Sequence, residues 1–310
     1  MYEKIIEIKT KDKLNYVIEI SPDDNKVFLS LNEQGYILTK ENFLKLNEQN
    51  LLSLNNEKAK IFNLEDTISK ARFTSEEKQI FISDQTKNII GYNLDDNNLG
   101  EQNNKFNINI KNPKTWKFEL NNEKGILATG GNNIFIYDYI NNKILKEIEN
   151  KNKFVYSFCF LSNNRLAVGN SNGSIYLYDI ENNNQDNKTK IEEHCLLVRN
   201  LAYNKNGNIL YSASDDLHIN QIDINKLEVL FPLVGHKEPI SDMIYNSKKN
   251  ILITSSFDGT IKIWDIKGKS NCIDTLEASQ KNPIWDISIS QEGNLIYYTS
   301  SEGIGAFMLK

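Results

Sequence analysis

The sequence predicts an all-β fold in which seven four-stranded sheets form a ring, a seven-bladed β-propeller closed by its N-terminal strand. Two observations predict this fold. A Trp-Asp-like pair recurs along the chain, and each copy contains the same order of alternating apolar runs and polar turns. The repeat is clearest over residues 235–265, which open with Gly-His and close with Trp-Asp. A repeated unit with these ends is typical of one propeller blade.

The repeat can be followed back from residue 265. The pair occurs at Trp264 and Asp265, then at Ile222 and Asp223, Tyr178 and Asp179, Tyr137 and Asp138, and Tyr92 and Asn93. Successive copies lie about 41 to 45 residues apart, which is the length of one blade. Within a copy, an Asn/Asp/Gly turn of the hairpin type precedes a third strand that alternates regularly. No stretch has a convincing helical period, so only strands are expected.

The two ends of the chain are expected to meet in one blade. Residues 280–310 hold three strands, and residues 3–9 supply a spare one. An open ring would leave sheet edges unpaired, so residues 2–10 are expected to complete the last blade. The alternative is a frayed N-terminal tail. In the first blade, residues 40–60 exceed one turn and are expected to form a long loop. The predicted blades of this single domain are 14–64, 65–110, 111–150, 151–192, 193–234, 235–279, and 280–310 with 2–10.

Composition narrows the functional classes. The chain has 310 residues and a net charge of −5, so it offers no basic face for direct nucleic-acid binding. No apolar run approaches the roughly 18 residues of a membrane span, and the N-terminus lacks the features of a signal peptide. We therefore expect the cytoplasm, with the nucleus as the alternative. Cys159, Cys195 and Cys272 have no paired spacing and are expected to be buried, reduced thiols.

A polar relay is predicted inside the blades. In blades of this kind a loop His, a strand hydroxyl, a turn Asp and a third-strand Trp are hydrogen-bonded, here His236, Thr254, Asp258 and Trp264. In the preceding blade His194, Ser212 and Asp216 fit, but Ile222 replaces the Trp. In the last blade Gln280 and Glu302 stand at the His and Asp positions.

A His-hydroxyl-Asp set also resembles a catalytic triad. We interpret it as structural because the hydroxyl lies on a strand inside the blade. Three His and three Cys residues lack ligand spacing, and His218 is expected at the surface. No enzyme activity, cofactor or metal is therefore expected, and a propeller hydrolase is the least favoured alternative.

The upper rim, where each blade begins, is the predicted partner surface. Its loop positions are unusually apolar, and acidic residues lie on the neighbouring turns. This combination suits an extended peptide with an apolar anchor and an Arg. The alternative is that Trp116 and Trp285 are half-buried strand residues. The candidate contacts are Trp116, Phe154, Val198, Pro239, Ile240 and Trp285, with Asp216, Asp258 and Glu302.

The stretch 111–309 resembles the WD-repeat (WD40) family, and most closely the WD-repeat subunit of the superkiller (Ski) complex, a subunit also found in the RNA-polymerase-associated Paf complex. The similar segments are NPKTWKFEL, NKFVYSFCFLSNNRLAVGNSNGSIYLYDI, VRNLAYNKNGNILYSASDDLHINQIDI, and SSFDGTIKIWDIKGKSNCIDTL followed by NPIWDISIS.

The resemblance implies a non-catalytic scaffold, a monomeric propeller within a hetero-complex. Its implied partners are a tetratricopeptide-repeat subunit and an RNA helicase that feeds messenger RNA to the exosome for 3′-to-5′ decay. It further implies recognition of a short Gln-Arg motif with a hydrophobic residue on the upper face. The alternative is a histone-tail reader, or a substrate adaptor of a ubiquitin ligase, that uses the mouth of the central channel.

Overall fold

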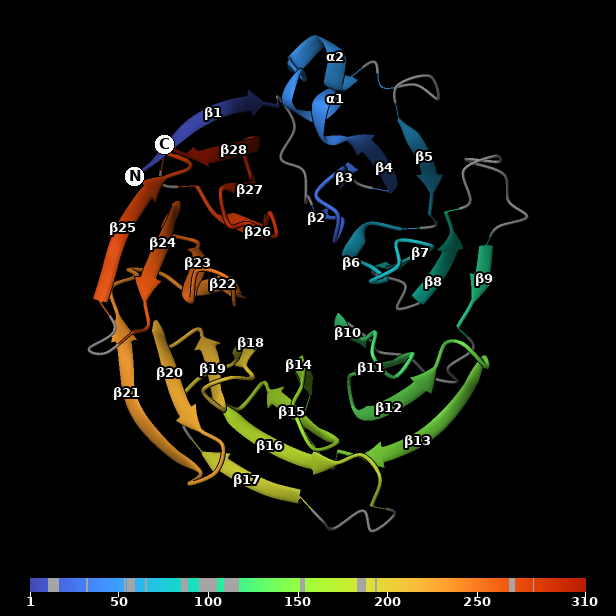
Figure 1. The fold of residues 1–310 in the computed structure, drawn as a ribbon, viewed down its shortest axis with the longest axis vertical. Coiled ribbons are helices and arrows are strands. Elements are labelled where there is room, and N and C mark those ends of the chain that lie inside the picture. Colours follow the sequence, from blue (N-terminus) through green and yellow to red (C-terminus); the bar gives the residue numbers. More distant parts are fainter. Residues whose placement is uncertain are drawn as a thin grey trace.

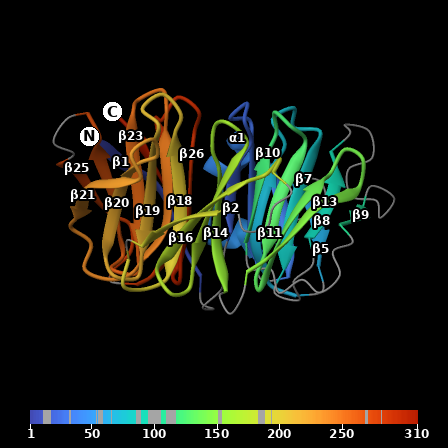
Figure 2. The same cartoon turned by 90° about the horizontal axis from the view of Figure 1, so that it is seen from below.

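Seven four-stranded antiparallel sheets surround a central axis in the computed structural model (Figure 1). Seen from the side, the ring is a disc whose strands run from one face to the other (Figure 2). These sheets confirm the predicted all-β, seven-bladed fold. The structure describes residues 1–10, 17–31, 33–52, 54, 59–64, 66–84, 89–94, 105–108, 117–150, 154–182, 188–192, 194–267, 271–280 and 282–310.

The blades are numbered in chain order, and the first strand of each lies nearest the axis. Blade 1 contains β2 (Ile18–Ile20), β3 (Lys26–Leu31), β4 (Gln34–Thr39) and β5 (Lys60–Asn63). Blade 2 contains β6 (Ile68–Phe73), β7 (Gln79–Asp84), β8 (Ile89–Asn93) and β9 (Lys105–Asn107). Blade 3 contains β10 (Lys117–Asn121), β11 (Ile126–Gly130), β12 (Asn133–Asp138) and β13 (Lys143–Glu149).

The second half of the ring repeats the same order. Blade 4 contains β14 (Val155–Phe160), β15 (Arg165–Asn170), β16 (Ser174–Asp179) and β17 (Lys188–Glu192). Blade 5 contains β18 (Val198–Asn204), β19 (Ile209–Ser214), β20 (His218–Asp223) and β21 (Glu228–Val234). Blade 6 contains β22 (Ile240–Asn246), β23 (Ile251–Ser256), β24 (Thr260–Asp265) and β25 (Asn271–Glu277). Blade 7 contains β26 (Ile284–Ile289), β27 (Leu295–Ser300), β28 (Gly303–Leu309) and β1 (Tyr2–Lys9).

The N-terminal strand closes the ring, as predicted. β1 pairs antiparallel with β28, in a register that runs from Tyr2 opposite Leu309 to Lys9 opposite Gly303. Two backbone hydrogen bonds extend the pairing: Thr10 N donates to Glu302 O at 2.7 Å and Lys310 N to Met1 O at 3.1 Å. The two chain ends therefore lie side by side (Figure 1).

Two short helices replace part of the loop expected over residues 40–60. They are α1 (Lys40–Leu44) and α2 (Glu48–Leu52). Thr39 caps α1 by accepting a hydrogen bond from Asn42 N at 3.2 Å. The Phe43 side chain has no exposed surface and packs edge-on against Tyr297, with ring centroids 5.2 Å apart. The expectation of strands alone was wrong here, because a five-residue helix is too short to display a helical period.

Apolar packing joins every blade to its neighbours. The seven hydrophobic clusters each draw residues from two adjacent blades, one cluster at each blade interface. Between blades 5 and 6, for example, Trp264 packs with Tyr211 and Leu252. Between blades 7 and 1, Ile8 of β1 is 2% exposed and packs with Ile18. Because a blade buries its apolar faces only against other blades, its stability depends on theirs.

Candidate protein-interaction site

The first strands share an irregularity at their upper ends. In five of them the pairing with the second strand skips one residue, which forms a β-bulge. A bulge leaves its extra residue unpaired and changes the direction of that side chain, and bulges are common beside functional sites. The skipped residues are Ser69, Tyr156, Arg199, Ser241 and Trp285.

Three bulge residues belong to an aromatic and cationic surface. Tyr156 packs edge-on against Phe154, with ring centroids 5.3 Å apart. Trp285 packs against Phe257 at 5.2 Å, and the Arg199 guanidinium lies 5.1 Å from the Phe257 ring centroid. All five side chains are half-buried. We call these five residues the mouth cluster; Tyr156, Arg199 and Trp285 lie on first strands, which surround the axis of the ring (Figure 1).

Arg199 is held in place by Asp215. The guanidinium meets the carboxylate through two nitrogens, Nε and Nη2, and the Nη2–Oδ2 distance is 2.9 Å. A two-point pair fixes the guanidinium plane, so Arg199 stays over the Phe257 ring. Lys117 Nζ donates to the Arg199 carbonyl at 3.0 Å and ties blade 3 to the same point. The mouth cluster is therefore a pre-organised surface, which lowers the entropy cost of binding a partner.

Val198 and Ile240 are not available to a partner. Each has 0% exposure and lies in the apolar clusters on either side of blade 5. Their assignment as rim contacts was wrong, because the apolar residue before each bulge faces the neighbouring blade. Phe154, Pro239 and Trp285 are half-buried, as a contact surface needs, while Trp116 lies outside the described residues. Tyr156 and Arg199 were missed because the sequence carries no signal for a bulge. Phe257 was missed because its partners, Arg199 and Trp285, come from other blades.

The turn carboxylates are engaged inside the protein. Asp258 Oδ2 accepts hydrogen bonds from Lys237 N at 2.9 Å and lies 2.9 Å from His236 Nδ1. Burial would raise the pKa of Asp258, but these bonds, together with one from Thr260, hold it well below its ordinary value. Burial would also raise the pKa of Asp216, but its hydrogen bond with His194 and its backbone hydrogen bonds lower it. Glu302 accepts from Ser279 at 3.3 Å and from Asn282 at 2.5 Å.

The relay residues form a continuous hydrogen-bonded chain in blade 6. His236 Nε2 lies 2.8 Å from Thr254 Oγ1, which also accepts a hydrogen bond from Trp264 Nε1 at 2.9 Å. In blade 5, His194 lies 2.8 Å from Ser212 Oγ, and the buried Ile222 leaves that chain without its last member. Both His side chains are 0% exposed, so this arrangement braces the blade and presents no hydroxyl to a substrate.

Charged residues of the first strands meet around the axis. Lys70 Nζ lies 3.0 Å from Asp286 Oδ1 and 3.9 Å from Asp242 Oδ2. Arg72 lies 2.7 Å from Glu19 and 3.5 Å from Glu119. We call these six residues the channel ion cluster; they come from blades 1, 2, 3, 6 and 7. Two cations of blade 2 thus contact four carboxylates of other blades.

Burial shifts the titration of the channel groups. It raises the pKa of Glu19 to about 7 and that of Asp286 to about 6, against the opposing effect of the neighbouring cations. It lowers the pKa of Lys117 to about 8. Asp286 also accepts the Ile18 backbone N–H at 2.9 Å, which joins blade 7 to blade 1 near the axis. The cluster therefore links blades around the axis.

The cysteines differ from expectation. All three are free thiols, but Cys195 and Cys272 are exposed and Cys159 is half-buried, so the prediction of burial was wrong. Each exposed cysteine lies on a loop or outer strand, where the apolar character of Cys does not lead to burial. His218 is exposed, as expected. Within the described ranges, no group of three His, Cys, Asp or Glu residues is placed to hold a metal ion. No helix in those ranges has the length and apolar character needed to cross a membrane.

Comparison with known proteins agrees with this architecture. The family described as "WD domain, G-beta repeat" matches residues 186–223 and 227–265. These stretches cover much of blades 5 and 6, which contain the two His relays. The protein is thus a seven-bladed β-propeller in which two stretches are similar to the WD domain, G-beta repeat.

Several curated proteins are similar to parts of the chain. WD repeat-containing protein 55 from Danio rerio is 31% identical over 44% of this chain and 35% of its own length. COMPASS component SWD3 from Saccharomyces cerevisiae is 34% identical over 30% of this chain and 29% of its own length. Target of rapamycin complex subunit wat1 from Schizosaccharomyces pombe is 22% identical over 51% of this chain and 50% of its own length. The chain spans half the length, or less, of each of these relatives.

Proposed function

We propose that this propeller is a non-catalytic assembly subunit that grips a segment of a protein partner at the mouth cluster. The observation that carries the proposal is the set of half-buried aromatic rings and one fixed Arg at the upper ends of the first strands. The few residues that supply most of the binding energy in protein interfaces are enriched in Trp, Tyr and Arg. Two of the similar proteins are named as parts of complexes, COMPASS and a target of rapamycin complex, which supports an assembly role.

More specifically, we propose that the protein is the WD-repeat subunit of the Ski complex. In that role the mouth cluster binds a short segment that contains Gln-Arg and a hydrophobic residue. The partners are a tetratricopeptide-repeat subunit and an RNA helicase active in exosome-dependent messenger RNA decay, in the cytoplasm. A role in the Paf complex would place the protein in the nucleus. The support for this finer proposal is the resemblance of the segments quoted above.

Replacement of Trp285 tests the proposed site. A Trp285→Ala variant is expected to lose at least tenfold in partner binding, because truncation of an aromatic hot spot costs about 2 kcal/mol or more. Wild type, this variant and Phe231→Ala, which removes a 42%-exposed ring from the outer wall, are compared by gentle affinity purification and mass spectrometry. Thermal unfolding of each variant reports on the fold.

The proteins recovered decide between the assemblies. A tetratricopeptide-repeat protein and an RNA helicase that disappear with Trp285→Ala support the finer proposal. Recovery of chromatin proteins or ubiquitin-ligase subunits without a helicase would contradict the Ski-complex proposal and favour a histone-tail reader or a ubiquitin-ligase adaptor. Equal recovery by all three proteins would refute the mouth cluster as the binding site. A large fall in the unfolding temperature of Trp285→Ala alone would assign Trp285 to the core instead.

A further inference from the structure

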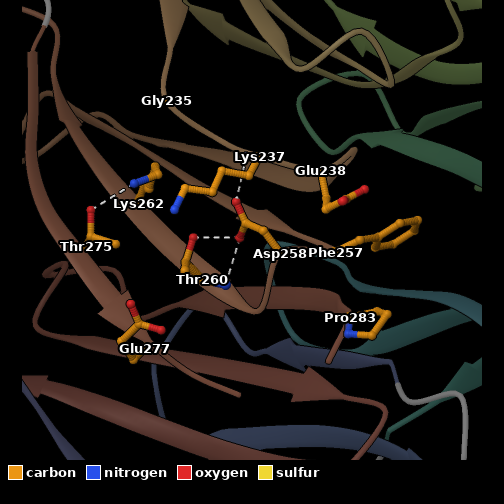
Figure 3. Close-up of a pocket in the computed structure, with 10 residues that line it drawn as sticks. All are labelled: Gly235, Lys237, Glu238, Phe257, Asp258, Thr260, Lys262, Thr275, Glu277 and Pro283. Carbon is orange, nitrogen blue, oxygen red and sulfur yellow. Dashed lines mark hydrogen bonds between the residues drawn. The ribbon is translucent and has the colours of Figure 1, made fainter. Parts of the chain in front are cut away.

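Three neighbouring blades supply the centre of the mouth cluster. Arg199 belongs to blade 5, Phe257 follows β23 of blade 6, and Trp285 belongs to blade 7. The Phe257 ring centroid lies 5.1 Å from the Arg199 guanidinium and 5.2 Å from the Trp285 ring. Figure 3 shows this Phe257 ring pointing away from Asp258, the next residue of the turn, and it lines a groove of about 630 Å³ through which a ligand can reach it. The three side chains form one surface only while the blades keep their spacing.

The residue that follows each bulge, here called the post-bulge residue, bonds to another blade. In chain order these bonds cross from blade 4 to 5, from 5 to 6, from 6 to 7 and from 7 to 1. The bond from blade 4 runs from Ser157 Oγ to Val198 O at 3.0 Å. Post-bulge residues therefore join the first strands beside the mouth cluster. They are Lys70, Ser157, Asn200, Asp242 and Asp286.

Asp242 is the post-bulge residue of blade 6 and contacts both neighbouring blades. Its Oδ1 accepts a hydrogen bond from Asn200 Nδ2, and Asn200 directly follows Arg199 in β18. Its Oδ2 accepts a hydrogen bond at 3.3 Å from Ile287 N, two residues after Trp285 in β26. One carboxylate of blade 6 therefore links the strands that carry Arg199 and Trp285.

The surroundings of Asp242 keep its side chain charged and fixed. The residue is 3% exposed, and Lys70 Nζ lies 3.9 Å from its Oδ2. Burial would raise the pKa of Asp242, but Lys70 and Lys117 hold it below its ordinary value. Breaking either hydrogen bond would leave a buried, charged oxygen short of a donor, which costs more than the bond itself contributes. The link between blades 5 and 7 therefore resists opening.

We propose that Asp242 is a positioning residue of the mouth cluster, whose two hydrogen bonds hold Arg199 and Trp285 at the spacing that lets both contact Phe257. This inference rests on the proposed function and adds a buried residue to the residues on which partner binding depends. Without the link, β18 and β26 can separate, and a ligand has to restore their spacing as it binds. Ordering of this kind weakens binding, because its entropy cost offsets part of the gain from the contacts.

Substitutions at this link separate the hydrogen bonds of Asp242 from its charge. Asp242→Leu replaces the carboxylate by an apolar group of similar shape and removes both bonds. Asp242→Asn removes the charge but keeps both bonds once the Asn200 amide turns over, because Nδ2 then donates to Asn200 while Oδ1 accepts from Ile287 N. Asn200→Ala breaks the bond to blade 5 alone. The control is Ser288→Ala, which removes a different buried bond between blades, from Ile20 N at 3.0 Å.

The affinity for a selected peptide measures the effect on binding. A random peptide-display library is selected on the full wild-type chain, and a labelled peptide that Trp285→Ala fails to bind is kept as the probe. Asp242→Leu is expected to bind this peptide about tenfold more weakly than the wild type, and Asn200→Ala about threefold, because the unlinked strands must be ordered on binding. Asp242→Asn and Ser288→Ala are expected to bind like the wild type. Thermal unfolding identifies any variant that does not fold.

The NMR signal of the Trp285 indole N–H reports its position without a ligand. The chain has three Trp residues, so isotope-labelled protein gives three indole signals, which Trp285→Phe and Trp264→Phe assign. Asp242→Leu is expected to shift the Trp285 signal, because the indole moves relative to the Phe257 ring. The signal of Trp264, which is bonded to Thr254 on the third strand of blade 6, is expected to stay in place.

The outcomes separate the positioning role from the proposed function. Unchanged peptide affinity and an unchanged Trp285 signal in Asp242→Leu and Asn200→Ala overturn the positioning role, and Asn200→Ala decides alone if Asp242→Leu does not fold. A loss with Asp242→Asn or Ser288→Ala as large as that with Asp242→Leu also overturns it, since charge or general stability then explains the effect. If no selected peptide depends on Trp285, the proposed function fails, whereas a shifted Trp285 signal in Asp242→Leu still supports the positioning role.

Discussion

The third-strand position that carries Trp264 in blade 6 is filled differently in neighbouring blades. Blade 4 has Tyr178, whose buried hydroxyl has no hydrogen-bond partner in the described residues, and blade 5 has Ile222. Only Trp264 reaches the strand hydroxyl, with Nε1 2.9 Å from Thr254 Oγ1. All three side chains are buried, but among the described residues only that of Trp264 also forms a hydrogen bond. Trp264 therefore stabilises its blade through both burial and hydrogen bonding, and the other two through burial alone.

Substitution at this position separates burial from hydrogen bonding. Trp264→Phe is expected to lower the free energy of unfolding by about 2 kcal/mol, since it shrinks a buried side chain and removes a buried bond. Tyr178→Phe in blade 4 removes only an unpartnered hydroxyl and is expected to be neutral or stabilising. Urea unfolding of both variants provides the comparison. Equal losses would mean that Thr254 contributes nothing through Trp264.

At the scale of the strand, β-bulges distinguish the two edges of each blade. On the outer edge, four strands carry an extra residue in their pairing. In three of them the skipped residue is a large exposed apolar one: Ile5, Leu145 and Ile273, at 38%, 48% and 58% exposure. In β21, Leu230 and Phe231 lie opposite Gln221. Bulges twist an edge away from flat pairing and so protect it against aggregation. On the inner edge, three of the five skipped residues, Tyr156, Arg199 and Trp285, belong to the mouth cluster.

The closing strand offers a matched pair of substitutions. Ile8→Ala is expected to destabilise the protein by about 2 to 4 kcal/mol, because Ile8 is 2% exposed in the cluster between blades 7 and 1. Ile5→Ala, in the same strand but at the bulge, is expected to change stability by about 0.5 kcal/mol or less. Thermal and urea unfolding measure both. Similar losses from the two variants would argue against β1 as the strand that seals the ring.

Strands were predictable from the sequence, whereas the short helices and part of the site were not. The Trp-Asp spacing indicated five blades, and the strand patterns near both chain ends, together with the need to close the ring, predicted seven blades and the β1–β28 pairing. The helices α1 and α2 were not predicted because each is too short to show a helical period. Within the site, Trp285 was identified, whereas Arg199 and Phe257 were not. Their role depends on a bulge and on a contact between blades 5 and 6, and neither leaves a local pattern.

For the molecule as a whole, apolar clusters join neighbouring blades and the channel ion cluster joins blades across the axis. Lys70 contacts acidic residues of blades 6 and 7 from its place in blade 2. Removing one partner of a buried ion pair leaves an uncompensated charge, which costs more than the pair contributes. The ring should therefore depend strongly on this one ammonium group.

Lys70→Met is expected to destabilise the protein by about 3 kcal/mol or more. The loss should be greater at pH 8 than at pH 5. Burial raises the pKa of Asp286 to about 6, so the contribution of that group to stability is complete below its unfolded value of about 3.9 and is lost as pH rises through 6. Because Lys70 lowers the pKa of Asp286, its removal raises that pKa further, and the loss of stability between pH 5 and pH 8 becomes larger.

Urea unfolding of Lys70→Met at both pH values measures this effect. Lys248→Met, which breaks an exposed pair with Glu292, serves as the control and is expected to resemble the wild type at either pH. A Lys70→Met deficit that is the same at pH 5 and pH 8 would exclude Asp286 as the coupled group.

The pairing of β1 with β28 also dictates an order of events on the ribosome. β1 emerges before the intervening blades and its partner β28 emerges after them, so β1 must remain unpaired while those blades are made. During that interval the nascent chain exposes two unsealed flanks, one at blade 1 and one at the growing end. Chaperones that bind exposed β-strands would bind these two flanks. A translation product that stalls before β28 would remain an open, unclosed ring.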